Sequence, residues 1–188
     1  RIAAGTFLAA ILSTKGSGIV NGINPEHLPM ELKKLGEMGA KIDSTETSIN
    51  IEYQDNLQSI ELSTLPFPGI ATDLQPIFGS ALLLAEGTSI LTENVYDQRF
   101  QWIPEVQRMG ANIQTGWQHA MIKGVESLSG APVHATDIRT GASLIIAALQ
   151  ADGLSTITGI DHINRGYEDI VTSLSSLGST IEYNNTNG

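Results

Sequence analysis

Cysteine is absent from this sequence of 188 residues, and basic residues are scarce. Without cysteine, a disulfide framework, a thiolate metal site and a thiol nucleophile are excluded within these residues. Ten Lys and Arg side chains stand against twenty Asp and Glu, which gives a formal net charge of -10. Because no basic cluster interrupts this acidity, we expect neither nucleic acid nor an anionic membrane as a partner.

Long hydrophobic runs are also missing. No apolar stretch approaches the roughly 18 residues that a membrane-spanning helix needs, and no basic-then-apolar segment of the signal type is found. We therefore expect a cytoplasmic protein. With 41% hydrophobic residues, the chain can bury one sizeable core, so we expect a single domain over residues 1–188.

Sequence signatures of metal and nucleotide sites are absent as well. The four histidines show no metal-ligand spacing, and neither a Walker nor a dinucleotide glycine pattern occurs. We therefore expect neither a metal nor a cofactor. The histidines are His27, His119, His134 and His162.

An internal repeat is the most regular feature of the chain. The segments LKKLGEMGAKI (32–42), IPEVQRMGANI (103–113) and IVTSLSSLGSTI (170–181) each carry apolar residues at helical spacing, then a glycine, then an isoleucine three positions later. This pattern predicts a helix that ends at a left-handed glycine cap and is followed directly by a strand. The glycines are Gly39, Gly110 and Gly178, and a second set lies upstream at nearly constant spacing, at Gly16, Gly87 and Gly153.

The repeat divides the chain into three units, at about 1–65, 66–130 and 131–188, each predicted to run helix, strand, helix, strand. Alternating apolar residues predict further strands at 48–53 and 59–64. The fold class is therefore α/β (or α+β), with three βαβ-type units around a shared core. The first unit has no strand before its first helix, so we expect that upstream residues supply one and that the chain is truncated.

The tripeptide ATD opens two apolar runs, at Ala71 and at Ala135. One interpretation is helix capping, because Thr and Asp accept hydrogen bonds from free N–H groups at the positive end of a helix. The other is a site for an anionic ligand, formed by helix N-termini that face one surface. There an aspartate could act as a base toward a hydroxyl, and Arg139 could bind phosphate or carboxylate. In the first unit Thr6 takes the corresponding position without an acid.

The segment HINRGYED (162–169) gathers His162, Arg165, Tyr167 and two acids at the start of a predicted helix. It is either a solvated loop with a charged helix cap or part of a site, and its residues alone do not separate the two.

Five segments together resemble the enolpyruvyl transferases, and in particular the branch that acts on UDP-N-acetylglucosamine. The match is nearly collinear from residue 1 to about residue 182. The resemblance implies an inside-out α/β barrel of three βαβαββ units that lacks its N-terminal strand, as one of two similar domains, with the second domain absent from this chain. The segments are FPGIATDLQ (67–75), LTENVYDQRF (91–100), VQRMGANI (106–113), GVESLSGAPVHATDIRTGASL (124–144) and HINRGYEDI (162–170).

The resemblance also implies a reaction. The enolpyruvyl group of phosphoenolpyruvate is transferred to the 3-hydroxyl of UDP-N-acetylglucosamine with release of phosphate, the first committed step of peptidoglycan synthesis in cell wall biogenesis. This chain by itself is expected to be inactive, because the transition state needs groups from both walls of the cleft. The alternatives are a domain of a shikimate-3-phosphate enolpyruvyl transferase and a non-catalytic binding or scaffold module on the same fold.

By the same resemblance, two aspartates are catalytic. Asp73 binds the sugar hydroxyl that attacks and acts as its base, and Asp137 orients its cationic neighbours. Among the arginines, Arg139 assists the phosphate and Arg165 grips phosphoenolpyruvate in the bidentate manner that suits a guanidinium.

The resemblance implies two further substrate-binding positions, and the sequence differs from the family pattern at two points. The backbone at Val95 meets the nucleotide sugar, and Arg99 is its neighbour in the site. Phe67 stands where relatives carry a histidine, so any polar contribution of that side chain is lost. The family's loop cysteine or acid and its phosphoenolpyruvate-binding lysine and asparagine lie outside this sequence.

Overall fold

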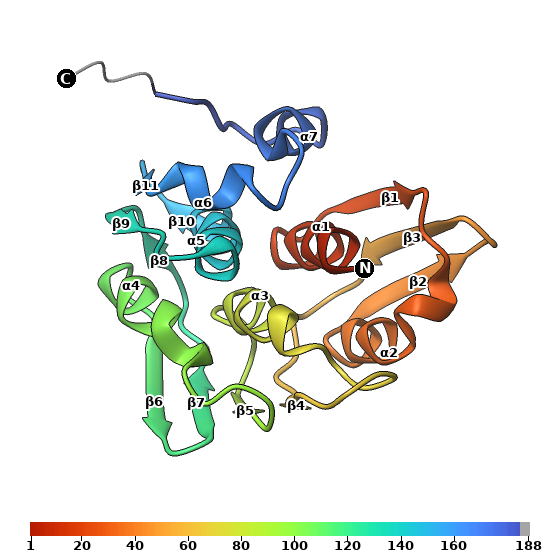
Figure 1. Ribbon diagram of the computed structural model, residues 1–188, viewed down its shortest axis with the longest axis horizontal. Helices are drawn as coiled ribbons and strands as arrows, with labels where there is room; N and C mark the ends of the chain where they lie inside the picture. Colours follow the sequence, from red (N-terminus) through yellow and green to blue (C-terminus); the bar gives the residue numbers. More distant parts are fainter. Residues whose placement is uncertain (185–188) are drawn as a thin grey trace.

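The computed structural model describes residues 1–184. Three helices pack against one another at its centre, and the strands lie toward the outside (Figure 1). The central helices are α1 (Ile2–Ser13), α3 (Gln75–Ala81) and α5 (Ile138–Gln150). Helices inside and sheets outside form the inside-out α/β arrangement predicted above.

The remaining elements surround this trio. The other helices are α2 (Pro29–Glu37), α4 (Ile103–Arg108), α6 (Ile160–Asn164) and α7 (Ile170–Ser176), and the 3₁₀ turns are η1 (Pro25–His27), η2 (Thr72–Leu74) and η3 (Arg99–Trp102). The strands are β1 (Ser17–Asn21), β2 (Ala40–Ser44), β3 (Ser48–Tyr53), β4 (Glu61–Ser63), β5 (Thr88–Thr92), β6 (Asn112–Gly116), β7 (His119–Lys123), β8 (Leu128–Ser129), β9 (Pro132–His134), β10 (Ala151–Asp152) and β11 (Thr156–Thr158).

The strands form four small sheets. The first has the order β1-β3-β2 and is antiparallel, and the second has the order β4-β5-β7-β6, in which only the pair β4 and β5 is parallel. The parallel pairs β8 with β10 and β9 with β11 make the other two. The middle of the chain, from β4 to β7, follows the βαβαββ order in full.

The predicted glycine caps are confirmed. Gly39, Gly110 and Gly178 have φ angles of 105°, 99° and 95°, which favour glycine, and each follows a helix. A strand follows the first two of these glycines, but the strand predicted after Gly178 is wrong for the described residues, since 179–184 form none. The physical reason is pairing: β2 and β6 bond to the strands that follow them, β3 and β7, whereas 179–184 have no such partner among the described residues.

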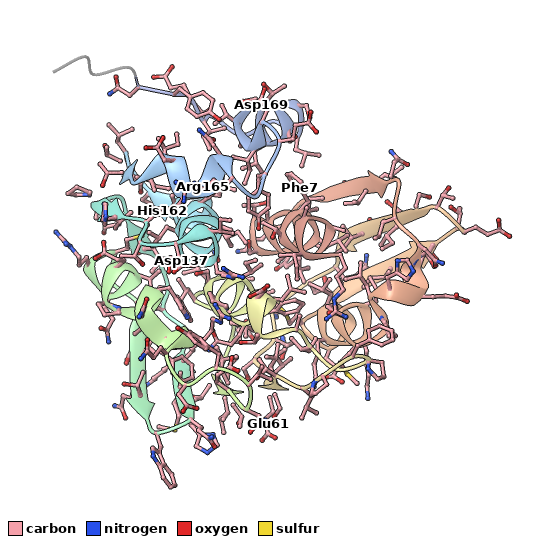
Figure 2. All side chains as sticks on the ribbon, in the orientation of Figure 1. Phe7, Glu61, Asp137, His162, Arg165 and Asp169 are labelled. Carbon is pink, nitrogen blue, oxygen red and sulfur yellow. The ribbon has the colours of Figure 1, made fainter. Side chains whose placement is uncertain are left out.

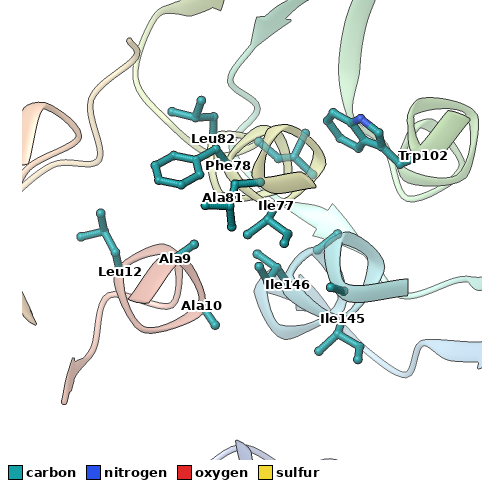
Figure 3. Packing of buried hydrophobic residues seen from close by; sticks show 14 of the residues in the cluster. Ala9, Ala10, Leu12, Ile77, Phe78, Ala81, Leu82, Trp102, Ile145 and Ile146 are labelled. Atoms are coloured by element: carbon teal, nitrogen blue, oxygen red, sulfur yellow. The ribbon is translucent and has the colours of Figure 1, made fainter. Parts of the chain in front are cut away.

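The three central helices owe their burial to the composition of their faces. α1 is apolar nearly all round, and every residue of α3 is buried, as is expected for helices inside a core. Figure 3 shows Ala9 of α1, Ile77 and Ala81 of α3, and Ile146 of α5 where the three helices meet. Small residues let the helices approach closely, so the geometry at their N-terminal ends is tightly constrained.

No helix among residues 1–184 is both long enough and apolar enough to cross a membrane.

Candidate functional site

The N-terminal ends of the central helices gather at one end of the trio. A Cβ added to Gly5 of α1 would lie 2.8 Å from Leu74 Cδ2, just before α3. Arg139 at the start of α5 donates from Nε to Asp73 Oδ1, also just before α3, at 2.7 Å. The starts of α1 and α5 thus both lie against the turn that precedes α3, as the anionic-site interpretation expects of helix N-termini that face one surface.

The two ATD segments have different roles. Asp137 is the N-cap of α5: it accepts hydrogen bonds from the N–H groups of Arg139 (2.8 Å) and Thr140 (3.3 Å) and from the Thr140 hydroxyl (2.7 Å). Asp73 caps no helix and lies inside the turn η2. The capping interpretation is therefore confirmed for Asp137 and is wrong for Asp73.

Asp73 is held by two guanidinium groups. Besides Arg139, Arg99 Nη2 lies 3.3 Å from Asp73 Oδ1. Arg99 also donates from Nε to Thr72 Oγ1 at 3.0 Å, and the ring of Tyr96 stacks on its guanidinium carbon at 4.6 Å. Both arginines reach the same carboxylate oxygen, so Asp73 Oδ2 is free of these contacts.

The ionisation of the cluster follows from these contacts. Burial tends to raise the pKa of Asp137, but the hydrogen bonds from Thr140 and the Arg139 N–H, together with the Arg139 charge, lower it below the usual 3.8. The hydrogen bond to Asp73 raises the pKa of Arg139 above its ordinary value. The site therefore holds a charged cap and a permanent cation next to Asp73.

Within the segment 162–169, one residue caps a helix and another is buried beside the cluster. Asp169 caps α7 by accepting from the Thr172 N–H at 3.1 Å. Tyr167 is buried, its hydroxyl lies 2.8 Å from Thr6 Oγ1, and burial raises its pKa. Because Thr6 is the position that matches the two ATD threonines, Tyr167 ties the first unit to the third beside the cluster.

A pocket of about 250 Å³ opens over this cluster. Arg139 and Asp137 line it from α5, and Arg99 lines it from η3. The other lining residues are Pro76, Tyr96, Gln98, Gln101 and Thr140. Two guanidinium groups and two amides in one pocket suit an anionic group that accepts several hydrogen bonds.

The other predicted residues, Asp73, Val95 and Arg165, do not line the pocket. Val95 is 51% exposed and its N–H bonds to Glu93, while Arg165 is exposed at the end of α6. In Figure 2, Arg165 lies on α6 and Asp137 at the start of the neighbouring α5. Phe67 is 61% exposed, with the guanidinium of Arg1 5.4 Å from its ring.

Six residues of the site were missed by reasoning from the sequence, among them Pro76 and Thr140 of the pocket wall. Tyr96, Gln98 and Gln101 line the pocket, and Glu93 supports the loop that carries them. The only available signal was the segment LTENVYDQRF (91–100), which places three of them beside Val95 and Arg99. Within residues 1–184, no group of three His, Cys, Asp or Glu side chains could hold a metal ion.

Residues 1–174 match the family described as EPSP synthase (3-phosphoshikimate 1-carboxyvinyltransferase). The chain belongs to this family. The resemblance to enolpyruvyl transferases stated from the motifs is thereby confirmed.

Curated relatives in the EPSP synthase family carry a more specific name. The chain is 45% identical over 183 residues to UDP-N-acetylglucosamine 1-carboxyvinyltransferase of Thermotoga maritima, covering 97% of this chain and 44% of the relative. It is 41% identical over 181 residues to UDP-N-acetylglucosamine 1-carboxyvinyltransferase 2 of Geobacillus kaustophilus, covering 96% of this chain and 42% of the relative. The chain thus spans less than half the length of these relatives.

Solved structures of the EPSP synthase family agree with the fold. The enolpyruvyl transferase NikO from Streptomyces tendae superposes with a TM-score of 0.85 at 26% identity, over 95% of this chain and 43% of that one. An EPSP synthase from Acinetobacter baumannii gives a TM-score of 0.73 at 21% identity, over 94% of this chain and 44% of that one. The second likeness concerns the fold alone.

Proposed function

We propose that this chain is a domain of an enzyme that transfers the enolpyruvyl group of phosphoenolpyruvate to the 3-hydroxyl of UDP-N-acetylglucosamine and releases phosphate. The observation that carries the proposal is the Asp73 carboxylate, which is held by Arg139 and Arg99, the two arginines that line the pocket. The name of the relatives at 41–45% identity supports the sugar nucleotide as the acceptor. Such a reaction would belong to peptidoglycan synthesis and would take place in the cytoplasm.

Asp73 is proposed as the base and the ligand of the attacking hydroxyl. Both arginines use Oδ1, so Oδ2 can accept the hydroxyl proton while the side chain stays fixed. A base held in place by two cations does not need to reorganise when the sugar arrives. Its partial exposure, with 31% of the side chain accessible, lets a substrate reach it.

The other predicted residues are proposed in supporting roles. Asp137 fixes the first turn of α5 and with it Arg139, whose remaining guanidinium nitrogens are proposed to stabilise the leaving phosphate. Arg165 is exposed and is proposed to grip phosphoenolpyruvate. The Val95 N–H is occupied by Glu93, so its carbonyl is the group proposed to meet the sugar nucleotide.

A second domain is proposed to close over this pocket. The curated relatives extend over more than twice the length that this chain covers. The resemblance assigns the loop acid, the lysine and the asparagine to the part outside this sequence. This chain alone is accordingly proposed to bind the sugar nucleotide weakly and to be inactive.

Calorimetric titration of the 188-residue chain with UDP-N-acetylglucosamine tests the proposal. Asp73→Asn should raise the Kd about tenfold or more, because a hydrogen bond to a charged group contributes roughly 1.5–3 kcal/mol. Asp43→Asn, at an exposed position on β2, is the matched control and should leave the Kd unchanged. In the full-length protein, Asp73→Asn should abolish most phosphate release without unfolding it.

Shikimate 3-phosphate serves as the competing ligand, because the family description names the enzyme that acts on it. If shikimate 3-phosphate binds saturably and UDP-N-acetylglucosamine does not, the proposed acceptor is wrong and shikimate 3-phosphate takes its place. Binding of neither ligand, by the chain or by the full-length protein, would favour a non-catalytic module on this fold.

A further inference from the structure

Glu93 is a buried acid to which the proposed chemistry gives no role. It follows β5 directly and is 0% exposed. Its neighbour across the sheet is Thr64, which follows the parallel strand β4 and is equally buried. Burying a carboxylate is costly unless hydrogen bonds compensate, so its partners indicate what the residue does.

One oxygen of Glu93 collects three donors. Oε1 accepts from the Thr64 hydroxyl at 2.7 Å, from the Val95 N–H at 2.9 Å and from the Tyr96 N–H at 3.0 Å. Oε2 is buried and has no hydrogen-bond partner among the described residues. The carboxylate therefore anchors the loop at Val95 and Tyr96 to Thr64 at the end of β4.

The anchored loop continues to the site arginine. The Tyr96 carbonyl accepts from the Arg99 N–H at 3.0 Å, and the Tyr96 ring stacks on the Arg99 guanidinium. Arg99 in turn contacts Thr72 and Asp73. A short chain of contacts thus connects Glu93 with the Asp73 carboxylate.

We propose that Glu93 is a positioning residue: by fixing the Val95 and Tyr96 backbone, it sets the sugar-nucleotide contact at Val95 and holds Arg99 on Asp73. The binding part of this inference rests on the proposed function, whereas the placement of Arg99 does not. Replacing Glu93 should therefore disturb the ligand-free site as well as weaken binding.

The test compares Glu93→Ala with Glu93→Gln in the 188-residue chain. NMR spectroscopy measures hydrogen exchange of the Val95 and Tyr96 amides and the signal of Arg99 Nε, and titration gives the Kd for UDP-N-acetylglucosamine. Glu93→Ala should speed exchange at both amides about tenfold, shift the Arg99 Nε signal and raise the Kd about tenfold. Glu93→Gln keeps an acceptor oxygen and should restore the exchange rates and the Kd to within about threefold.

Ser89→Ala provides a control for a general loss of stability. Ser89 is also buried on β5 and accepts a hydrogen bond from the Ile60 N–H at 3.1 Å, away from the loop. If Glu93→Ala lowers Tm no differently from Ser89→Ala and leaves the Arg99 Nε signal in place, the proposal is overturned. If Glu93→Ala does not fold, Thr64→Val removes one donor to Oε1, together with the acceptor of the Asn94 N–H in the same loop, and should produce the same changes in smaller degree.

Failure of the proposed function would be visible separately. If the unsubstituted chain and the full-length protein bind no sugar nucleotide, that function fails. The exchange rates and the Arg99 Nε signal of the free chain then still decide whether Glu93 positions Arg99.

Discussion

Gly79→Ala should damage both the core and the site. Gly79 lies in the fully buried helix α3, and a Cβ there would meet Trp102 Cζ2 at 2.4 Å and Cη2 at 2.5 Å. Trp102 is fully buried and donates from Nε1 to Gln75 Oε1 at 3.2 Å. Because Trp102 ends the turn η3 that begins at Arg99, moving the indole also moves the segment that carries the site arginine.

The size of the effect follows from the contact distances. Ordinary contacts begin at 3.4 Å, so the rigid indole must shift by about 1 Å. Overpacking of this kind costs about 1–3 kcal/mol, whereas alanine gains roughly 0.5–1 kcal/mol over glycine in a helix. We expect a net loss of about 1–2 kcal/mol in the free energy of unfolding, which lowers the urea midpoint by roughly 0.5 M.

Trp102 itself provides the signal for this measurement. The chain has two tryptophans, and Trp117 is 98% exposed with a φ of 51°, so Trp117→Asn suits its backbone and leaves Trp102 as the only reporter. Urea unfolding is then followed by Trp102 fluorescence. Gly36→Ala in α2, where an added Cβ meets nothing within 4 Å, is the matched control and should gain about 0.5–1 kcal/mol. A midpoint for Gly79→Ala equal to or above that of the unsubstituted chain would refute the described packing of α3 against η3.

Two further predictions concern buried or capping acids. Glu31 is fully buried, and burial raises the pKa of its carboxyl group above the ordinary 4.5, although the backbone at Glu31 and Ala71 and the Arg1 charge act to lower it. The unfolded chain therefore releases this proton at a lower pH than the folded chain, and stability falls as pH rises above 4.5. Glu31→Gln should therefore raise Tm at pH 7 and give a smaller gain at pH 4, and an equal gain at both would contradict the assignment. Asp137→Ala should cost about 0.5–2 kcal/mol of unfolding free energy through loss of the α5 cap, while Asp137→Asn should keep most of it. Since the folded pKa of Asp137 is lowered, its charge-dependent contribution is present above 3.8 and fades as pH falls through the lower value, which urea unfolding across pH would detect.

Local sequence was sufficient for the repeated secondary structure. The glycines that end helices had to adopt positive φ, and Gly39 and Gly110 do so directly before strands. The same reasoning failed after Gly178, because a strand requires a bonding partner and a strand propensity does not supply one. The apolar runs that follow the two ATD tripeptides form the helices α3 and α5, which are largely buried in the core.

The different roles of the two ATD segments could be predicted from the local sequence only in part. Pro76 lies in the first turn of α3, which begins at Gln75, so Asp73 falls before the helix in a 3₁₀ turn. The third unit has no proline there, α5 begins at Ile138, and Asp137 becomes its cap with an extended φ of -156°. Pro76 could have predicted this difference from the sequence. The direction of the Asp73 carboxylate, however, depends on how the three helices pack.

The sequence by itself determined the repeat and the helix ends at glycines, because these follow from local periodicity and backbone preference, and side-chain chemistry singled out some of the residues that meet at the site. Only the tertiary structure decided which of these residues meet. Asp73 and Arg139 are 66 positions apart, and Thr6 and Tyr167 are 161 apart. Such contacts depend on how the central helices pack, and packing is a property of the whole core that no segment of the chain carries alone.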